Sequence, residues 1–161
     1  MELQFNEPNS ADRIEMYGEE EMRSLVQRLS FQREYGTQGN KHAEELIVNE
    51  FIDVFNKPPR ILGATRNIVM GDYLEAEHII GAHYDSEGDT PGADDNASAI
   101  AVMMRIAAYI HPSDNVCFVA FNAEEKGLLG SAEFVNTLVK STRQSNSFQQ
   151  LKETDQFLKW E

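Results

Sequence analysis

The segment Val116–Phe121 restricts the fold most strongly, because all of its residues are apolar. A strand with two apolar faces needs protein on both sides, as in the middle of an α/β sheet. Apolar residues at helical spacing predict a helix from Ala97 to Ile110, and an earlier strand is predicted at His78–Asp85. A strand, a helix and a second strand in this order form a right-handed unit with parallel strands. The sequence therefore predicts an α/β protein.

The same spacing rules predict the remaining elements. Gly36–Asn40 is predicted to be a turn, and Ile61–Met70 predicts a strand followed by a polar connection. Further helices are predicted where apolar residues recur every three or four positions, at Met22–Leu29, Ala43–Phe55 and Leu129–Val139.

Composition narrows the class of protein. The 161 residues are 41% hydrophobic, which is enough for one folded domain. The 14 basic and 27 acidic side chains leave a net charge of −13, which disfavours nucleic acid and anionic membrane surfaces as partners. The stretch before Tyr17 contains no signal-peptide pattern, so a cytoplasmic location is expected, and the single cysteine, Cys117, is expected to be a buried core thiol.

Three polar clusters follow or precede these elements: His83–Asp85, Asp94–Asn96 and Glu124–Glu125. The first and last follow neighbouring parallel strands, and the second lies at the start of the helix between them. The carboxyl ends of parallel strands are where open α/β sheets bind ligands. An imidazole among several carboxylates is a donor set that suits zinc.

Each cluster also has a simpler interpretation. Asp94–Asn96 could cap the helix, His83 could be a core histidine with satisfied hydrogen bonds, and Glu124–Glu125 could be an exposed loop pair. Three such clusters at one sheet edge favour a site over three coincidences. The remaining histidines are predicted to lie outside that site: His42, His78 and His111.

Three segments of this sequence resemble the leucyl-aminopeptidase-like di-zinc exopeptidases, metallopeptidase family twenty-eight. The likeness extends from about Ser24 to Val135 and includes Arg33. It implies a three-layer α/β/α fold with a mixed, mainly parallel central sheet. The segments are Ile80–Ser86, Pro91–Ser98 and Ala123–Ser131.

The resemblance also implies roles for individual residues. His83 would bind one zinc ion, Asp95 would bridge two, and Glu125 would bind the other. Asp85 would orient the His83 ring, and Asp95 would be joined to Asn96 by a cis peptide, with Asp94 beside them as a supporting residue. Glu124 resembles the general base, and the implied substrate is a peptide with a free amino terminus.

The later part of the chain departs from the family pattern. The family has a further Asp and a further His as zinc ligands, but no histidine follows His111, and neither Glu153 nor Asp155 is assigned as a ligand. A C-terminally shortened member is therefore expected, with an aminopeptidase-like domain at 1–145 and a polar, helical tail at 146–161. The shortened sheet would expose Val116–Phe121 or a neighbouring strand, which could drive self-association.

Three functions remain open at this point. The first is zinc-dependent removal of the N-terminal residue of a peptide. The second is a non-catalytic, metal-poor descendant of the same fold that acts as an interaction module. The third is a glutaminyl cyclase, which shares the zinc fold but has a different loop pattern.

Overall fold

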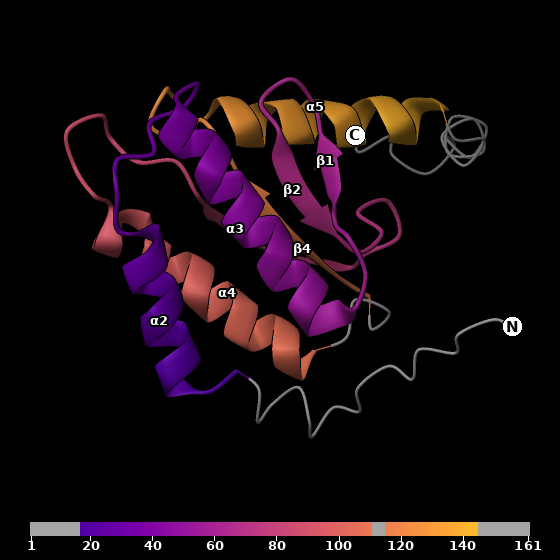
Figure 1. Cartoon of the computed structure of the whole chain (residues 1–161). Helices are drawn as coiled ribbons and strands as arrows, with labels where there is room; N and C mark the ends of the chain where they lie inside the picture. Colours follow the sequence, from indigo (N-terminus) through magenta and orange to yellow (C-terminus); the bar gives the residue numbers. More distant parts are fainter. Residues whose placement is uncertain (1–16, 111–114, 145–161) are drawn as a thin grey trace, which may run out of the picture.

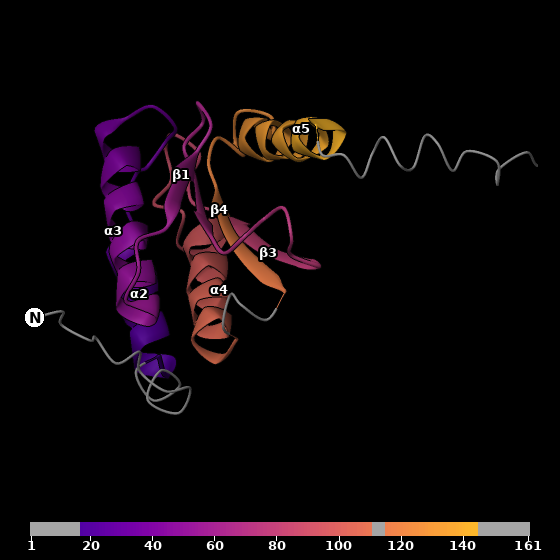
Figure 2. The same ribbon diagram turned by 90° about the vertical axis from the view of Figure 1, so that its right-hand side faces the viewer.

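The computed structural model describes residues 17–110 and 115–144, which form a sheet with helices on both faces (Figure 1). Helices α2, α3 and α4 cover one face, and α5 lies on the opposite side (Figure 2). The predicted α/β class and its layered arrangement are therefore confirmed.

The sheet is mixed, with strand order β1-β2-β4-β3. Only β3 and β4 are parallel, whereas β1 pairs with β2 and β2 pairs with β4 in antiparallel fashion. The expectation of a mainly parallel sheet is thus wrong for the described strands. The strands are β1 (Arg60–Leu62), β2 (Asn67–Met70), β3 (His78–His83) and β4 (Val116–Phe121).

The antiparallel pairs arise because the segment predicted as one strand, Ile61–Met70, forms a hairpin. Gly63 and Arg66 have positive φ angles of 77° and 67°, which reverse the chain between β1 and β2. Glu133 of α5 supports this turn by accepting hydrogen bonds from the backbone N–H groups of Ala64 and Thr65. The prediction of one strand over Ile61–Met70 is therefore wrong, because a turn that begins at Gly63 divides it.

The main core lies between the sheet and helices α2 (Glu19–Leu29), α3 (Gln38–Phe55) and α4 (Ser98–Tyr109). Helix α3 begins inside the predicted turn, because the Thr37 side chain accepts a hydrogen bond from the N–H of Asn40 and caps the helix. Helix α4 matches its predicted position and joins β3 to β4, as the parallel unit required.

Helix α5 (Leu129–Gln144) covers the other face through a smaller cluster around Phe134. The Phe134 ring packs edge-on against Phe121 at 5.6 Å between centroids. Cys117 is fully buried in this cluster, and burial raises the pKa of its thiol to about 12. The prediction of a buried core thiol is therefore confirmed.

Among the described strands, β4 lies inside the sheet and its neighbour β3 forms one of the two edges. Of the two alternatives for an exposed strand, the structure therefore selects β3, where Ile79 keeps 41% of its surface exposed. No helix among residues 17–110 and 115–144 is long and apolar enough to cross a membrane. The predicted helical tail at 146–161, together with His111, Glu153 and Asp155, lies outside the described residues.

Candidate metal centre

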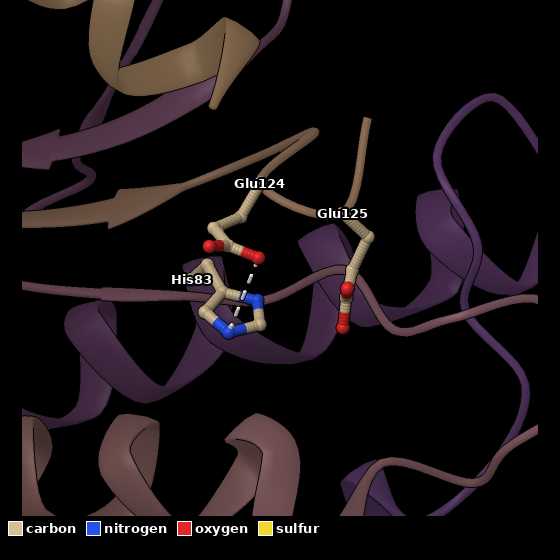
Figure 3. A group of neighbouring side chains, drawn as sticks. All are labelled: His83, Glu124 and Glu125. Atoms are coloured by element: carbon tan, nitrogen blue, oxygen red, sulfur yellow. Dashed lines mark ion pairs between the residues drawn. The ribbon is translucent and has the colours of Figure 1, made fainter. Parts of the chain in front are cut away.

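The polar clusters predicted from the sequence meet at one edge of the sheet. His83 is the last residue of β3, and Glu124 and Glu125 lie in the loop that follows β4. Because β3 and β4 are parallel and in register, with His83 opposite Phe121, both strands deliver these side chains to the same place. Figure 3 shows His83 and Glu124 facing one another, with Glu125 beside them.

The distances within this group are short. One donor atom from each of His83, Glu124 and Glu125 lies within 4.8 Å of the others. The Nε2 atom of His83 is 3.0 Å from Asp95 Oδ1 and 3.9 Å from Glu124 Oε2. The His83 side chain is only 11% exposed, whereas Asp95 is 75% exposed, so the group lines a surface that is open on the Asp95 side.

Asp85 is fully buried and connects the two strands behind this group. Its Oδ1 accepts a hydrogen bond from the N–H of Glu124, and its Oδ2 accepts one from the N–H of Glu125, both at 3.1 Å. The chain can turn back to make these bonds because Ala123 adopts a left-handed conformation, with φ 57°. Asp85 therefore fixes the backbone from which both glutamates project.

The same carboxylate also faces the histidine. Asp85 Oδ1 lies 3.5 Å from His83 Nδ1, an atom that is buried and has no hydrogen-bond partner within the described part of the chain. The His83 ring thus presents Nδ1 to Asp85 and Nε2 to Asp95 and Glu124. In zinc proteins, a histidine ligand commonly turns its second nitrogen toward a carboxylate in this manner.

Neighbouring charges perturb the titration of the group. Burial lowers the pKa of His83, but the nearby carboxylates of Asp85, Glu124 and Asp95 raise it by more, so the pKa lies above the ordinary 6.5. Burial and repulsion from Asp95 and Glu124 raise the pKa of Glu125 above 4.5, while His83 opposes this shift. Crowded carboxylates of this kind favour a bound cation.

The segment from Asp94 to Asn96 contacts both the start of α4 and His83. The side-chain oxygen of Asn96 accepts a hydrogen bond from the N–H of Ala99, which caps the start of α4. Asp95 instead faces His83, and the Asp95–Asn96 peptide bond is cis. Asp94 is exposed, and its backbone carbonyl accepts a hydrogen bond from the Ser98 hydroxyl.

The histidines predicted to lie elsewhere do so where they are described. His42 lies near the start of α3 with 60% of its side chain exposed, and its Nδ1 is 3.9 Å from Glu45 Oε2. His78 begins β3, at the end opposite His83.

The sequence reading missed two buried polar groups that support the site. Asn40 and Asn122 exchange side-chain hydrogen bonds at 2.9 and 3.0 Å, which fixes the residue two positions before Glu124 to helix α3. The fully buried guanidinium of Arg33 is the second group. Arg33 lies within the part of the sequence that resembles the family, which drew attention to it. Nothing in the sequence indicated what its side chain contacts.

The residues present fit a divalent metal ion. The donor set combines one imidazole with several carboxylates, the ligands that zinc accepts. A bound cation would relieve the repulsion that contributes to the raised pKa of Glu125. The buried Nδ1 of His83 faces the carboxylate of Asp85, as the second nitrogen of a histidine metal ligand commonly faces a carboxylate.

The fold and the donor set together define a zinc-exopeptidase-like α/β domain. The structure superimposes on the Legionella pneumophila LapA aminopeptidase with a TM-score of 0.62 at 19% identity, over 87% of this chain and 46% of that one. The sequence model of the family described as "Peptidase family M28" matches residues 67–157, which is more than half of the chain. The chain belongs to peptidase family M28.

Curated relatives match at higher identity over shorter segments. Aminopeptidase YwaD of Bacillus subtilis is 50% identical over 60 residues, 35% of this chain and 13% of YwaD. A "Probable zinc metalloprotease" of Pyrenophora tritici-repentis is 41% identical over 71 residues, 37% of this chain and 16% of the relative. The matched segments thus cover only a small part of these relatives.

A glutaminyl cyclase has the same fold. The Porphyromonas gingivalis enzyme superimposes with a TM-score of 0.59 at 21% identity, over 72% of this chain and 52% of that one. At this identity the likeness concerns the fold alone.

Proposed function

We propose that this chain carries out zinc-dependent hydrolysis of the N-terminal residue of peptides, as an aminopeptidase-type metallopeptidase. The observation that carries the proposal is the meeting of His83, Glu124 and Glu125 at one edge of the sheet, with Asp95 at 3.0 Å from His83. Membership of peptidase family M28 supports peptides as the substrate class. The names of YwaD and of the fungal relative support an aminopeptidase that uses zinc.

Three residues would hold the metal. His83 would bind one zinc ion through Nε2, Glu125 would bind a second, and Asp95 would bridge the two. When bound, zinc lowers the pKa of a coordinated water and polarises a substrate carbonyl.

Asp85 would keep His83 ready for this task. With a proton on Nδ1 directed at Asp85, the lone pair of Nε2 is available to the metal. The buried carboxylate also fixes the N–H groups of Glu124 and Glu125, so one residue positions both sides of the site. Asp85 thus contributes to catalysis by orienting groups.

Glu124 would act as the general base. Its side chain is 37% exposed and lies 3.9 Å from His83, so it can reach both the metal group and a substrate at the surface. In this role it accepts a proton from the attacking water and passes it to the leaving amine. The backbone bond to Asp85 holds it in place while the proton moves.

The ligand count predicts weak metal binding by this chain. Within the part of the chain that the structure describes, His83, Asp95 and Glu125 would give each zinc ion two protein ligands, with Asp95 counted twice, whereas catalytic zinc sites normally keep three. Zinc affinity should therefore be lower than in a site with a full ligand set.

The test combines metal analysis with hydrolysis of a chromogenic leucyl substrate. With zinc in excess, we expect up to two ions per chain and turnover that falls roughly 100- to 10,000-fold in Glu124→Ala. Glu45→Ala removes an exposed carboxylate of α3 that pairs with His42, and it should leave both readouts unchanged. A chain that neither binds zinc nor hydrolyses the substrate would instead support the non-catalytic interaction module.

The exposed edge supports a second part of the proposal, self-association. Among the described strands, β3 has a neighbour on one side only, and its Ile79 is exposed. Unpaired edges of this kind pair with other chains. Size-exclusion chromatography coupled to light scattering should show oligomers, and Ile79→Lys should reduce them. A stable monomer at high concentration would contradict self-association.

A further inference from the structure

Arg33 is a fully buried charge in the segment between α2 and α3. An arginine side chain stays protonated in proteins, and an unpaired buried charge is costly. The guanidinium satisfies its donors with backbone carbonyl oxygens. Nε donates to Tyr84 at 2.8 Å, Nη2 to Gly92 at 2.7 Å, and Nη1 to Pro91 at 2.6 Å and to Leu29 at 2.7 Å.

Three of these carbonyl groups, those of Tyr84, Pro91 and Gly92, belong to the two segments that carry the candidate metal ligands. Tyr84 lies between His83 and Asp85, while Pro91 and Gly92 lead directly to Asp95. The backbone N–H of Arg33 adds a bond to the Ser86 hydroxyl at 3.1 Å. One side chain therefore connects the end of β3 to the approach to α4.

Gly92 shows how closely these groups pack. A Cβ atom at this position would lie 2.5 Å from the carbonyl oxygen of Asp95 and 2.8 Å from both terminal nitrogens of Arg33. Its φ of 57° also disfavours any residue with a side chain. The guanidinium thus fits against bare backbone, with no space between it and the Asp95 segment.

The charge of Arg33 also interacts electrostatically with the acids of the site. Burial lowers the pKa of its guanidinium, and the carboxylates of Asp85, Asp95 and Glu125 oppose that shift. A positive charge beneath these acids offsets part of their mutual repulsion when no metal is bound.

We infer that Arg33 is a positioning residue for the metal centre, which sets the separation between the His83–Asp85 segment and Asp95 through its bonds to Tyr84, Pro91 and Gly92. The effect of Arg33 on metal binding rests on the proposed function. Its effect on the positions of these segments can be tested on the chain without metal. Arg33 also bonds the carbonyl groups of Leu29 and Phe31 at the end of α2, so the test must separate positioning of the site from general support of the fold.

The first arm measures metal binding by Arg33→Lys, which keeps the charge but has three donors in place of the planar fork. Competition with a chromophoric chelator should show zinc affinity reduced roughly 10- to 100-fold, as for other residues behind metal ligands. The visible spectrum of the cobalt-loaded protein should change, because it reports ligand geometry. Arg23→Lys, an exposed residue paired with Glu19, is the matched control and should leave both unchanged.

The second arm needs no metal and follows amide hydrogen exchange. The N–H of Ala97 bonds the Gly92 carbonyl, and those of Glu124 and Glu125 bond Asp85. In Arg33→Lys these amides should exchange at least tenfold faster, while amides of β4 stay within about twofold of the wild-type chain.

The outcomes separate the two proposals. Unchanged exchange at Ala97, Glu124 and Glu125, or an equal acceleration at every core amide, would overturn the positioning role. A wild-type chain that binds no zinc would count against the proposed function, and the exchange arm would still decide the role of Arg33. If Arg33→Lys binds zinc as tightly as the wild-type chain does, the result would count against the positioning role of Arg33 and leave the proposed function intact.

Discussion

The core beneath helices α2–α4 and the strand ends that carry the candidate metal centre both contain fully buried side chains, but different forces hold them. In the core, Phe51, Ile68 and Phe118 are fully buried among other apolar side chains. At the edge, Asp85 and Arg33 are equally buried, yet each is held by specific hydrogen bonds near 3 Å. Apolar packing depends on volume, whereas polar bonding depends on the identity of each partner. Core changes should therefore alter stability, and edge changes should mainly alter metal binding.

The largest expected effect comes from the core change Phe51→Ala. The Phe51 ring packs against Phe55 at 6.2 Å between centroids, and its removal leaves a cavity. The free energy of unfolding should fall by roughly 3 to 5 kcal/mol, measured by urea denaturation. Phe51→Leu should cost less, because it leaves a smaller cavity. A zinc affinity that changes for the remaining folded molecules would weaken the distinction between the two regions.

Next in size is Asp85→Asn at the edge. The amide keeps one acceptor oxygen but loses the charge and one of the two bonds to Glu124 and Glu125. Zinc affinity should fall roughly 10- to 100-fold, or about 1.4 to 2.8 kcal/mol. Asp53→Asn, at an exposed position of α3, should have no such effect. If Asp85→Asn lowers stability but leaves zinc binding intact, the carboxylate serves the fold alone.

Acid should weaken metal binding at the edge without a matching effect on the core. The pKa of His83 is raised above 6.5 and that of Glu125 above 4.5, and zinc must displace any proton on these ligands. Zinc affinity should therefore fall by about tenfold per pH unit for each bound proton, starting above pH 6.5. Isothermal titration at several pH values measures this slope. A flat profile from pH 8 to 5 would exclude His83 as a ligand.

The metal-free chain should show the opposite pH trend. A pKa raised in the folded state stabilises the fold below the ordinary value, and this contribution is lost as pH rises through the folded value. The contribution of His83 to stability is thus present below pH 6.5 and lost at higher pH. Comparison of urea midpoints for the wild-type chain and His83→Gln isolates it.

The smallest expected effect is at Glu133, which supports the hairpin between β1 and β2. Its carboxylate accepts bonds from the N–H groups of Ala64 and Thr65 and from the Thr65 hydroxyl, which lower its pKa below 4.5. Stability from this group is present above pH 4.5 and is lost as pH falls through the lower value. Glu133→Gln should cost about 1 kcal/mol at neutral pH and leave zinc binding unchanged. Altered zinc binding would show that the hairpin and the site are coupled.

Periodic patterns predicted much of this fold, because apolar burial depends mainly on local spacing. The helical pattern from Ala97 to Ile110 and the apolar segment Val116–Phe121 correspond to α4 and β4. Their order also placed His83 and Glu124 at neighbouring strand ends, since parallel strands share an edge. The hairpin within Ile61–Met70 was not predicted, and the sheet is therefore less parallel than expected.

Within the candidate site, residue types were predictable and partners were not. The sequence indicated an imidazole and several carboxylates, including Asp85 behind His83. It did not indicate that Asp85 also accepts hydrogen bonds from the backbone N–H groups of both glutamates, or that the side chains of Asn40 and Asn122 bond to each other. The residues in these bonds are separated by 39, 40 and 82 positions in the sequence. The local spacing of residue types gives no information about pairs so far apart.

By itself, the sequence determined the α/β class, the order of the βαβ unit and the set of groups available to bind a cation, because these depend on local periodicity and chemistry. Only the tertiary structure decided that β3 forms the edge and that Arg33 lies beneath the acids with its charge directed at backbone carbonyls. Those outcomes depend on distances between segments that become neighbours only when the chain packs.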